Sequence, residues 1–251
     1  MMTLCKRFSG LTIALILAGC GARNDLAPVS EVKWQPYSTN QKTHVVRAGE
    51  TMYAIAFRYD TDYRRLATLN HISPPYSLRV GQVLSVQGLA RPQPVYYQRA
   101  VPTQARHYQP AQRPVVNKVI RTPLFRTRSA SGWMWPVTGT VVTTFIPDQG
   151  KKGINIASKK GDKVFASAAG VVAYAGSGLA GYGNLIIIKH NNEYLTAYGN
   201  NARNLVSEGQ RVNTGQAIAE VGVLEHRYWG VHFEIRKAGV PVNPLNYLQK
   251  G

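Results

Sequence analysis

Apolar positions near the start of the chain repeat first at strand spacing and then at helical spacing. The run "HVV" at 44–46 predicts a short strand, and Gly49 marks the turn that follows it. Helical spacing begins behind Thr51, and its apolar positions are Met52, Ile55, Ala56 and Tyr59. Residues three and four apart share one face of a helix, so this spacing predicts a helix with one buried side.

A second helix is expected directly after the first. Asp62 is a good residue to precede it, because a side-chain oxygen there accepts from the first free backbone N–H groups. The helix ends at Asn70 and His71, and the run "QVLSV" after Gly81 predicts a second strand. The apolar positions of this helix are Tyr63, Leu66, Ala67 and Leu69. Residues 43–87 therefore predict an α+β module of strand, helix, helix and strand.

The rest of the chain has two different patterns. Residues 88–131 are rich in Pro, Gln and Arg and carry no acidic residue, which predicts a disordered basic linker. We leave open whether this basic linker contacts an anionic polymer outside the chain or only separates the two domains. Residues 132–251 contain short β-branched and aromatic runs between Gly, Asn and Asp turns, so we expect a mainly-β domain with a solvated sheet face.

The charge of the chain favours an anionic partner. Lys and Arg number 30 against 12 Asp and Glu, a net charge of +18 over 251 residues. Nucleic acid, anionic lipid and an acidic polymer all satisfy this balance, and charge alone does not choose among them.

The N-terminal residues predict export. Lys6 and Arg7 precede the apolar run "LTIALILAGC", which is too short to cross a bilayer as a helix and is typical of a signal peptide. The end of that run resembles the bacterial lipobox, which implies that Cys20 is lipidated. The alternative is an ordinary signal peptide that contains this cysteine. The expected boundaries are a signal peptide over 1–19 and a spacer over 20–42.

The residues after the cysteine indicate which membrane holds the lipid. Gly21 and Ala22 stand where an aspartate would favour the inner membrane of enterobacteria, so we expect an outer-membrane anchor facing the periplasm. An exported chain meets no chromosome. We therefore expect no nucleic-acid partner, and we assign the basic charge to the cell wall or the membrane surface.

The N-terminal module resembles the LysM family. The resemblance rests on "GET" at 49–51, "IA" at 55–56, "LN" at 69–70 and "VGQVL" at 80–84. It implies that the module binds N-acetylglucosamine units of peptidoglycan between two loops. The glycan-binding residues that it implies are Gly49, Glu50, Thr51, Met52, Asn70, His71, Ile72 and Tyr76. The alternative is that the loop with Pro74, Pro75 and Tyr76 only closes the fold.

The C-terminal region resembles the LytM or lysostaphin-like peptidoglycan peptidases. The resemblance rests on "GINIA" at 153–157, "GYGNLIIIKH" at 181–190, "YLTAYGN" at 194–200 and "HFEIR" at 232–236. Active members hold zinc through a His, an Asp four residues later and the second His of an H-x-H pair. Two further histidines of that family assist the attacking water.

The residues at these positions are unsuited to zinc. Lys151 and Asn155 replace the first two ligands, and Gly230 replaces the first histidine of the pair; Asn200 replaces the remaining histidine. An ammonium group has no lone pair, an amide is uncharged, and only His232 remains. His190 and His226 lack a carboxylate at ligand spacing. No thiol is expected to survive processing, because Cys5 is removed with the signal peptide and Cys20 is lipidated, and the sequence has no G-x-S-x-G motif. We therefore expect no metal, no cofactor and no catalytic residue.

The order of these parts resembles the NlpD-like lipoproteins, including YgeR-like members. That resemblance implies a regulator that binds peptidoglycan and activates an N-acetylmuramyl-L-alanine amidase through the emptied peptidase groove. The groove residues expected to bind the partner are Lys151, Asn155, Tyr198, Asn200, Tyr228, Gly230 and His232. Two alternatives remain: a zinc endopeptidase that cleaves peptidoglycan cross-links, and a passive tether between membrane and wall.

Overall fold

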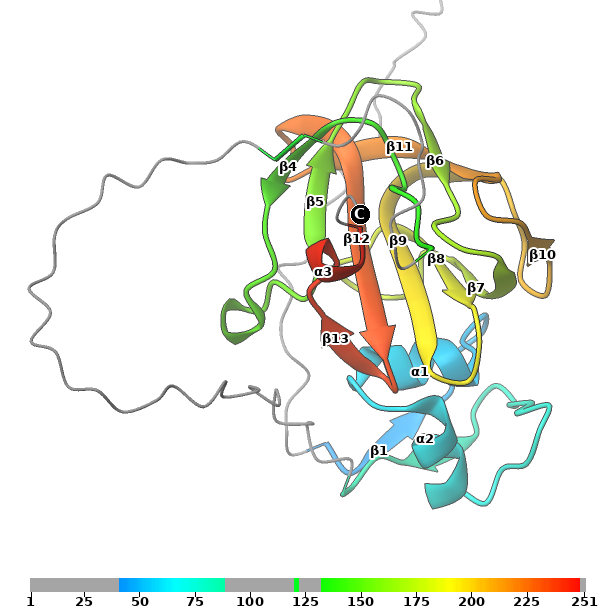
Figure 1. Ribbon diagram of the computed structural model, residues 1–251. Helices are drawn as coiled ribbons and strands as arrows, with labels where there is room; N and C mark the ends of the chain where they lie inside the picture. The colour runs from blue at the N-terminus through cyan, green and yellow to red at the C-terminus, as the bar shows by residue number, and fades with distance from the viewer. Residues whose placement is uncertain (1–40, 89–119, 122–131, 249–251) are drawn as a thin grey trace, which may run out of the picture. The chain divides into compact units, whose positions relative to one another are not determined.

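The computed structural model describes residues 41–88, 120–121 and 132–248. Residues 43–87 form the LysM-like module (Figure 1). Strand β1 (Thr43–Val45) pairs antiparallel with β2 (Val83–Ser85), and between them in the chain lie helices α1 (Met52–Arg58) and α2 (Tyr63–Leu69). The predicted order of strand, helix, helix and strand is confirmed.

Polar side chains fix the helix ends of this module. Thr51 Oγ1 accepts from the Ala54 N–H at 3.1 Å and begins α1, as the sequence predicts. Asp62 begins α2 in the same way. Asn70 ends α2: its amide nitrogen donates to the carbonyls of Leu66 and Ser85, both at 2.9 Å. The Asn70 side chain therefore ties the end of α2 to β2.

Residues 120–121 and 132–248 form the peptidase-like domain, built on one large sheet. Its strand order is β10-β7-β8-β9-β11-β12-β5-β4-β3, with β13 beside β12, β6 beside β11 and an additional pairing between β9 and β12. The bounds are β3 Ile120–Arg121, β4 Thr140–Thr143, β5 Ile154–Ala157, β6 Lys163–Phe165, β7 Gly170–Gly176, β8 Asn184–Lys189, β9 Tyr194–Asn204, β10 Arg211–Val212, β11 Ala217–Leu224, β12 Tyr228–Lys237, β13 Val240–Val242, the 3-10 helix Pro147–Gln149 and α3 Leu245–Leu248. The mainly-β expectation is confirmed.

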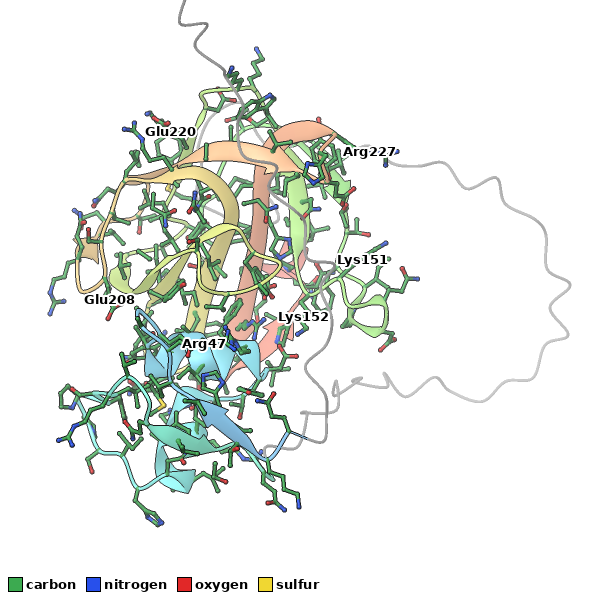
Figure 2. The ribbon with its side chains drawn as sticks, turned by 180° about the vertical axis from the view of Figure 1, so that it is seen from behind. Arg47, Lys151, Lys152, Glu208, Glu220 and Arg227 are labelled. Carbon is green, nitrogen blue, oxygen red and sulfur yellow. The ribbon has the colours of Figure 1, made fainter. Side chains whose placement is uncertain are left out.

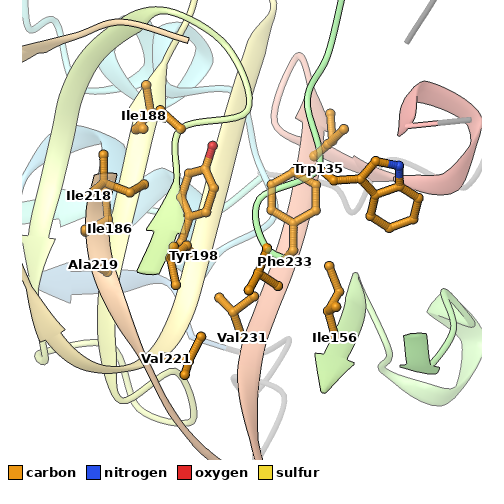
Figure 3. Close-up of a cluster of buried hydrophobic side chains, with 14 of the residues drawn as sticks. Trp135, Ile156, Ile186, Ile188, Tyr198, Ile218, Ala219, Val221, Val231 and Phe233 are labelled. Atoms are coloured by element: carbon orange, nitrogen blue, oxygen red, sulfur yellow. The ribbon is translucent and has the colours of Figure 1, made fainter. Parts of the chain in front are cut away.

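The long strands β9 and β12 run side by side through the middle of this sheet (Figure 1). Their apolar side chains form a core in which the rings of Tyr198 and Phe233 lie 5.3 Å apart (Figure 3). Register places His232 opposite Gly199 on β9 and opposite Asn155 on β5. The sheet thus brings together positions far apart in the sequence.

Part of the predicted linker is a strand. Ile120 pairs with Val141, so the sheet begins before the expected boundary at residue 132. Composition misses this strand because backbone pairing along a sheet edge needs few apolar side chains. The predicted signal peptide over 1–19, Cys20, residues 20–40 of the predicted spacer and linker residues 89–119 and 122–131 lie outside the described residues. Within the described ranges, no helix has the length and apolar character needed to cross a membrane.

Candidate functional site

The site centres on His232, which β12 holds between two neighbours. Its Nδ1 lies 2.7 Å from Asn155 Oδ1 and its Nε2 lies 3.0 Å from Glu234 Oε1. The His232 side chain is 19% exposed. Oxygen acceptors flank both ring nitrogens, so the imidazole is fixed in orientation by hydrogen bonds.

Glu234 is the buried anion behind this histidine. Its carboxylate also accepts from the Tyr182 hydroxyl at 2.9 Å and pairs with the guanidinium of Arg236 at 2.8 Å. Burial alone would raise the pKa of Glu234, but the charge of Arg236 and the hydrogen bond from His232 lower that pKa to about 2. Burial and the Glu234 charge raise the pKa of Tyr182 well above its usual value. Glu234 therefore stays ionised at neutral pH.

Asn155 joins this network to Glu225 and Tyr228. Its amide nitrogen donates to Glu225 Oε1 at 3.2 Å, and it lies 3.5 Å from the hydroxyls of Thr143 and Tyr228. Tyr228 is half-buried, and burial raises its pKa. The predicted residues Asn155, Tyr228 and His232 are thus brought together.

The two lysines just before β5 have different surroundings, and both are labelled in Figure 2. Lys151 is exposed, and its backbone forms an isolated antiparallel β-bridge with Ile146. Lys152 is buried, and its Nζ lies 2.7 and 2.5 Å from the two carboxylate oxygens of Asp60. Lys151 is therefore a surface cation four residues before Asn155 in the chain, whereas the Lys152 ammonium is buried against Asp60.

Gly230 and Asn200 are constrained by the backbone. A Cβ at Gly230 would lie 2.2 Å from the Ile156 carbonyl oxygen, far inside contact distance, so no side chain fits without a shift of the strand. Asn200 has φ of 59°, a left-handed conformation that asparagine tolerates, and its N–H donates to the Tyr182 carbonyl at 2.7 Å. Asn200 and Gly230 therefore supply no second imidazole beside His232.

Zinc does not fit this set of residues. A catalytic zinc needs three nitrogen or carboxylate donors around an open position, and here Lys151, Asn155 and His232 stand at the three ligand positions. Asn155 binds the histidine instead of a metal. Across the ranges that the structure describes, no group of three or more His, Cys, Asp or Glu side chains is placed to hold a metal.

The structure removes Tyr198 from the set of residues predicted to line the groove. Tyr198 is 0% exposed, its hydroxyl accepts from the Ser167 N–H at 2.8 Å, and it belongs to the core rather than to a partner surface. Side chains alternate along β9, and it is Gly199 that stands opposite His232. Sequence reasoning also missed Glu234 and Arg236. The signal was present in "HFEIR", where two charged residues interrupt an apolar strand.

The side chains of the predicted glycan-binding residues in the first loop mostly contact other residues of the protein. The Glu50 carboxylate pairs with His44 at 2.8 Å and Arg58 at 3.0 Å. Thr51 Oγ1 donates to the Ala173 carbonyl at 3.1 Å, and Met52 lies in the core of the module. Gly49 is exposed at φ of 76°. This loop offers backbone groups rather than free side chains.

The second loop is more open. Asn70 uses its side chain within the module, as described above. His71 is exposed, whereas Ile72 and Tyr76 are half-buried. The ring of Tyr76 lies 5.5 Å from that of Tyr63, which closes the loop onto α2. Glycan binding by these residues stays a prediction.

Comparison with known proteins agrees with this architecture. Residues 44–87 match the LysM domain, and residues 149–244 match Peptidase family M23. A relative in Pseudomonas aeruginosa named lipoprotein NlpD/LppB homolog is 38% identical over 98% of this chain and 92% of its own length. The chain belongs to the NlpD/LppB lipoprotein family.

Two further members of the NlpD/LppB family carry informative names. The Escherichia coli relative, named murein hydrolase activator NlpD, is 37% identical over 84% of this chain and 69% of its own length. A Histophilus somni relative, named outer membrane antigenic lipoprotein B, is 38% identical over 80% of this chain and 65% of its own length. The sequence-based assignment to NlpD-like lipoproteins is confirmed.

Proposed function

We propose that this chain is a non-catalytic lipoprotein that binds peptidoglycan and activates a cell-wall N-acetylmuramyl-L-alanine amidase. The observation that carries the proposal is the bonding of His232. The one remaining histidine of the zinc site is held by Asn155 and Glu234 within an intact sheet. A peptidase fold that keeps its framework but bonds its last ligand elsewhere favours binding over hydrolysis.

The surface around His232 supplies groups that suit a protein partner. Lys151 and Arg227 are exposed cations, and Tyr228 is a half-buried aromatic side chain that can anchor an apolar group. Asn155 adds amide hydrogen bonds at the mouth of the site. A partner segment with acidic and amide groups matches this chemistry. Activation then requires that the surface bind the active state of the amidase more tightly than its inactive state.

Other parts of the chain support a location at the cell wall. The LysM match supports peptidoglycan binding by residues 44–87. The lipobox at Cys20 and the names of the relatives support a lipid anchor in the outer membrane with the domains facing the periplasm. The net charge of +18 favours retention near anionic wall polymers.

A reconstituted release assay tests the proposal. Dye-labelled sacculi are incubated with the full chain in detergent, with a purified amidase of the same organism, and with both. We expect release above the amidase's own rate only when both are present. Release by the chain alone would indicate an endopeptidase. If the chain stimulated none of the organism's amidases, the passive tether between membrane and wall would be the remaining function. Either result contradicts the proposal.

A further inference from the structure

The LysM-like module and the peptidase-like domain share a buried arginine. All described residues fall in one compact unit. Arg236 is 1% exposed on β12, and its NH1 donates to the Phe57 carbonyl at 2.8 Å and to Asp60 at 3.0 Å, both in the LysM-like module. The guanidinium carbon lies 3.4 Å from the centroid of the Phe57 ring. Arg236 therefore donates hydrogen bonds to Phe57 and Asp60 of the LysM-like module and packs against the Phe57 ring.

A second buried cation shares the same carboxylate. Lys152 and Arg236 both pair with Asp60, and Arg236 also pairs with Glu234. Two cations and two anions balance within this cluster. Without the Asp60 charge, one buried positive charge has no counter-ion, and removal of one partner from a buried pair is strongly destabilising. Burial and the charge of Arg236 already lower the pKa of Lys152.

Apolar packing and further hydrogen bonds surround the ion cluster. Phe57 packs edge-on against Tyr182 at 5.3 Å between ring centroids. Arg58 donates to the Gly178 carbonyl at 3.0 Å, and Thr51 donates to the Ala173 carbonyl at 3.1 Å. The buried residues of this shared cluster are Ala54, Phe57, Ala173, Tyr174, Leu179, Tyr182, Leu185, Ile187, Leu195 and Ala197. One face of α1 is thus an apolar contact surface as well as a charged one.

The cluster continues to the candidate site. Asp60 contacts Arg236, Arg236 contacts Glu234, and Glu234 contacts His232, which bonds Asn155. Every link is a hydrogen bond of 3.0 Å or less. The end of α1 in the LysM-like module is therefore joined to the mouth of the site through side chains with fixed partners.

We infer that α1 of the LysM-like module is the resident partner of a cationic, apolar docking surface on the peptidase-like domain, with Asp60 as the shared counter-ion. Docking holds the two modules as one rigid unit and, through Arg236 and Glu234, orients His232. The functional consequence rests on the proposed function: the wall-binding module becomes a structural part of the amidase-binding site.

Cleavage of the linker tests the docking directly. A specific protease site is inserted between residues 105 and 106 of the full chain, the chain is cut, and the pieces are separated by size in detergent. We expect the parent pieces to elute together. Separate elution of two pieces that circular dichroism shows to be folded would overturn the inference.

Charge variants identify the counter-ion. Asp60→Asn keeps a residue that tolerates the left-handed φ of 51° but removes the charge, and we expect association at least about tenfold weaker. Lys152→Met added to Asp60→Asn removes the unbalanced cation, so most of the association should return. Glu220→Gln, which breaks surface pairs with Lys163 and Arg203, is the matched control and should change nothing. Equal effects of Asp60→Asn and Glu220→Gln, or no recovery in the double variant, would refute the role of Asp60.

An amidase readout separates this inference from the proposed function. If the parent chain stimulates an amidase, Asp60→Asn should reduce that stimulation and the double variant should restore it. If the parent stimulates none, the proposed function fails, while co-elution of the cut pieces still supports the docking. Undiminished stimulation by a variant whose pieces separate would show that the module is no part of the amidase-binding site.

Discussion

Gly230 shows at the residue scale why the lost zinc site involves more than missing ligands. The sequence reveals that a glycine stands where active peptidases carry histidine, but only the structure reveals the Ile156 carbonyl that fills the space a Cβ would need. The strand pairing between β12 and β5 is close because residue 230 has no side chain. Substitution and backbone packing are therefore coupled at this position.

Gly230→Ala should lower the free energy of unfolding by roughly 1–3 kcal/mol, because the strand must move to admit the methyl group. Gly178→Ala is the control, since its Cβ would meet only the end of the Tyr174 side chain, at 3.3 Å. Urea unfolding of both variants measures the difference. Equal stability of the two would contradict the close contact with Ile156.

His190 predicts a pH dependence. Its ring lies between the Ala169 carbonyl at 2.8 Å and the Thr196 hydroxyl at 2.7 Å, and burial lowers its pKa to about 4. The unfolded chain binds a proton near pH 6.5 while the folded chain does not until pH 4, so stability falls as pH drops through that window. The loss is at most about 3.5 kcal/mol.

Urea midpoints measured between pH 7 and pH 4 check this prediction, which uses about 1.4 kcal/mol per pH unit of pKa difference. His190→Gln cannot titrate, so its stability should vary less across the window. The exposed His71→Gln is the control and should keep the full slope. A parent whose stability is flat between those pH values would contradict a half-buried His190 that stays neutral in the folded chain.

At the scale of elements, local pattern predicted more than register did. The helices of the LysM-like module follow from their apolar spacing and from the N-terminal side chains of Thr51 and Asp62. The sheet order does not, because it depends on pairs far apart in the chain. The error at Tyr198 is of this kind: side chains on one strand alternate between faces, so a one-residue misjudgement moves a core residue into the site. Glu234 and Arg236 were missed because their partners come from other elements.

Asn70 carries an element-scale prediction. Its Oδ1 accepts from the Ser85 N–H at 2.6 Å while its amide donates back to the Ser85 carbonyl, so one side chain joins α2 to β2. Asn70→Ala should destabilise the module by about 1–3 kcal/mol, since two backbone groups of Ser85 lose their partner. Thr68→Ala, at an exposed position of α2, is the control. Thermal unfolding that affects both variants equally would contradict this structural role.

At the scale of the whole molecule, two kinds of wall affinity are expected, and salt separates them. The charge of +18 attracts anionic polymers, and that attraction is largely screened at about 1 M salt, where the Debye length is ~3 Å. Glycan binding by the LysM-like module through neutral hydrogen bonds should persist. We therefore expect sacculi to retain the chain at both low and high salt in a pull-down. Complete release at high salt would show that the affinity is electrostatic alone.

The central claim is that the surface beside His232 activates an amidase and hydrolyses nothing itself. The most direct measurement is the rate of peptide release from sacculi by a purified amidase with the parent chain, with Lys151→Glu/Tyr228→Ala and with Glu220→Gln. Loss of central interface residues costs on the order of 1–4 kcal/mol, so the double variant should stimulate at least about fivefold less, while Glu220→Gln matches the parent. Equal stimulation by all three, or release by the parent without amidase, would contradict the account.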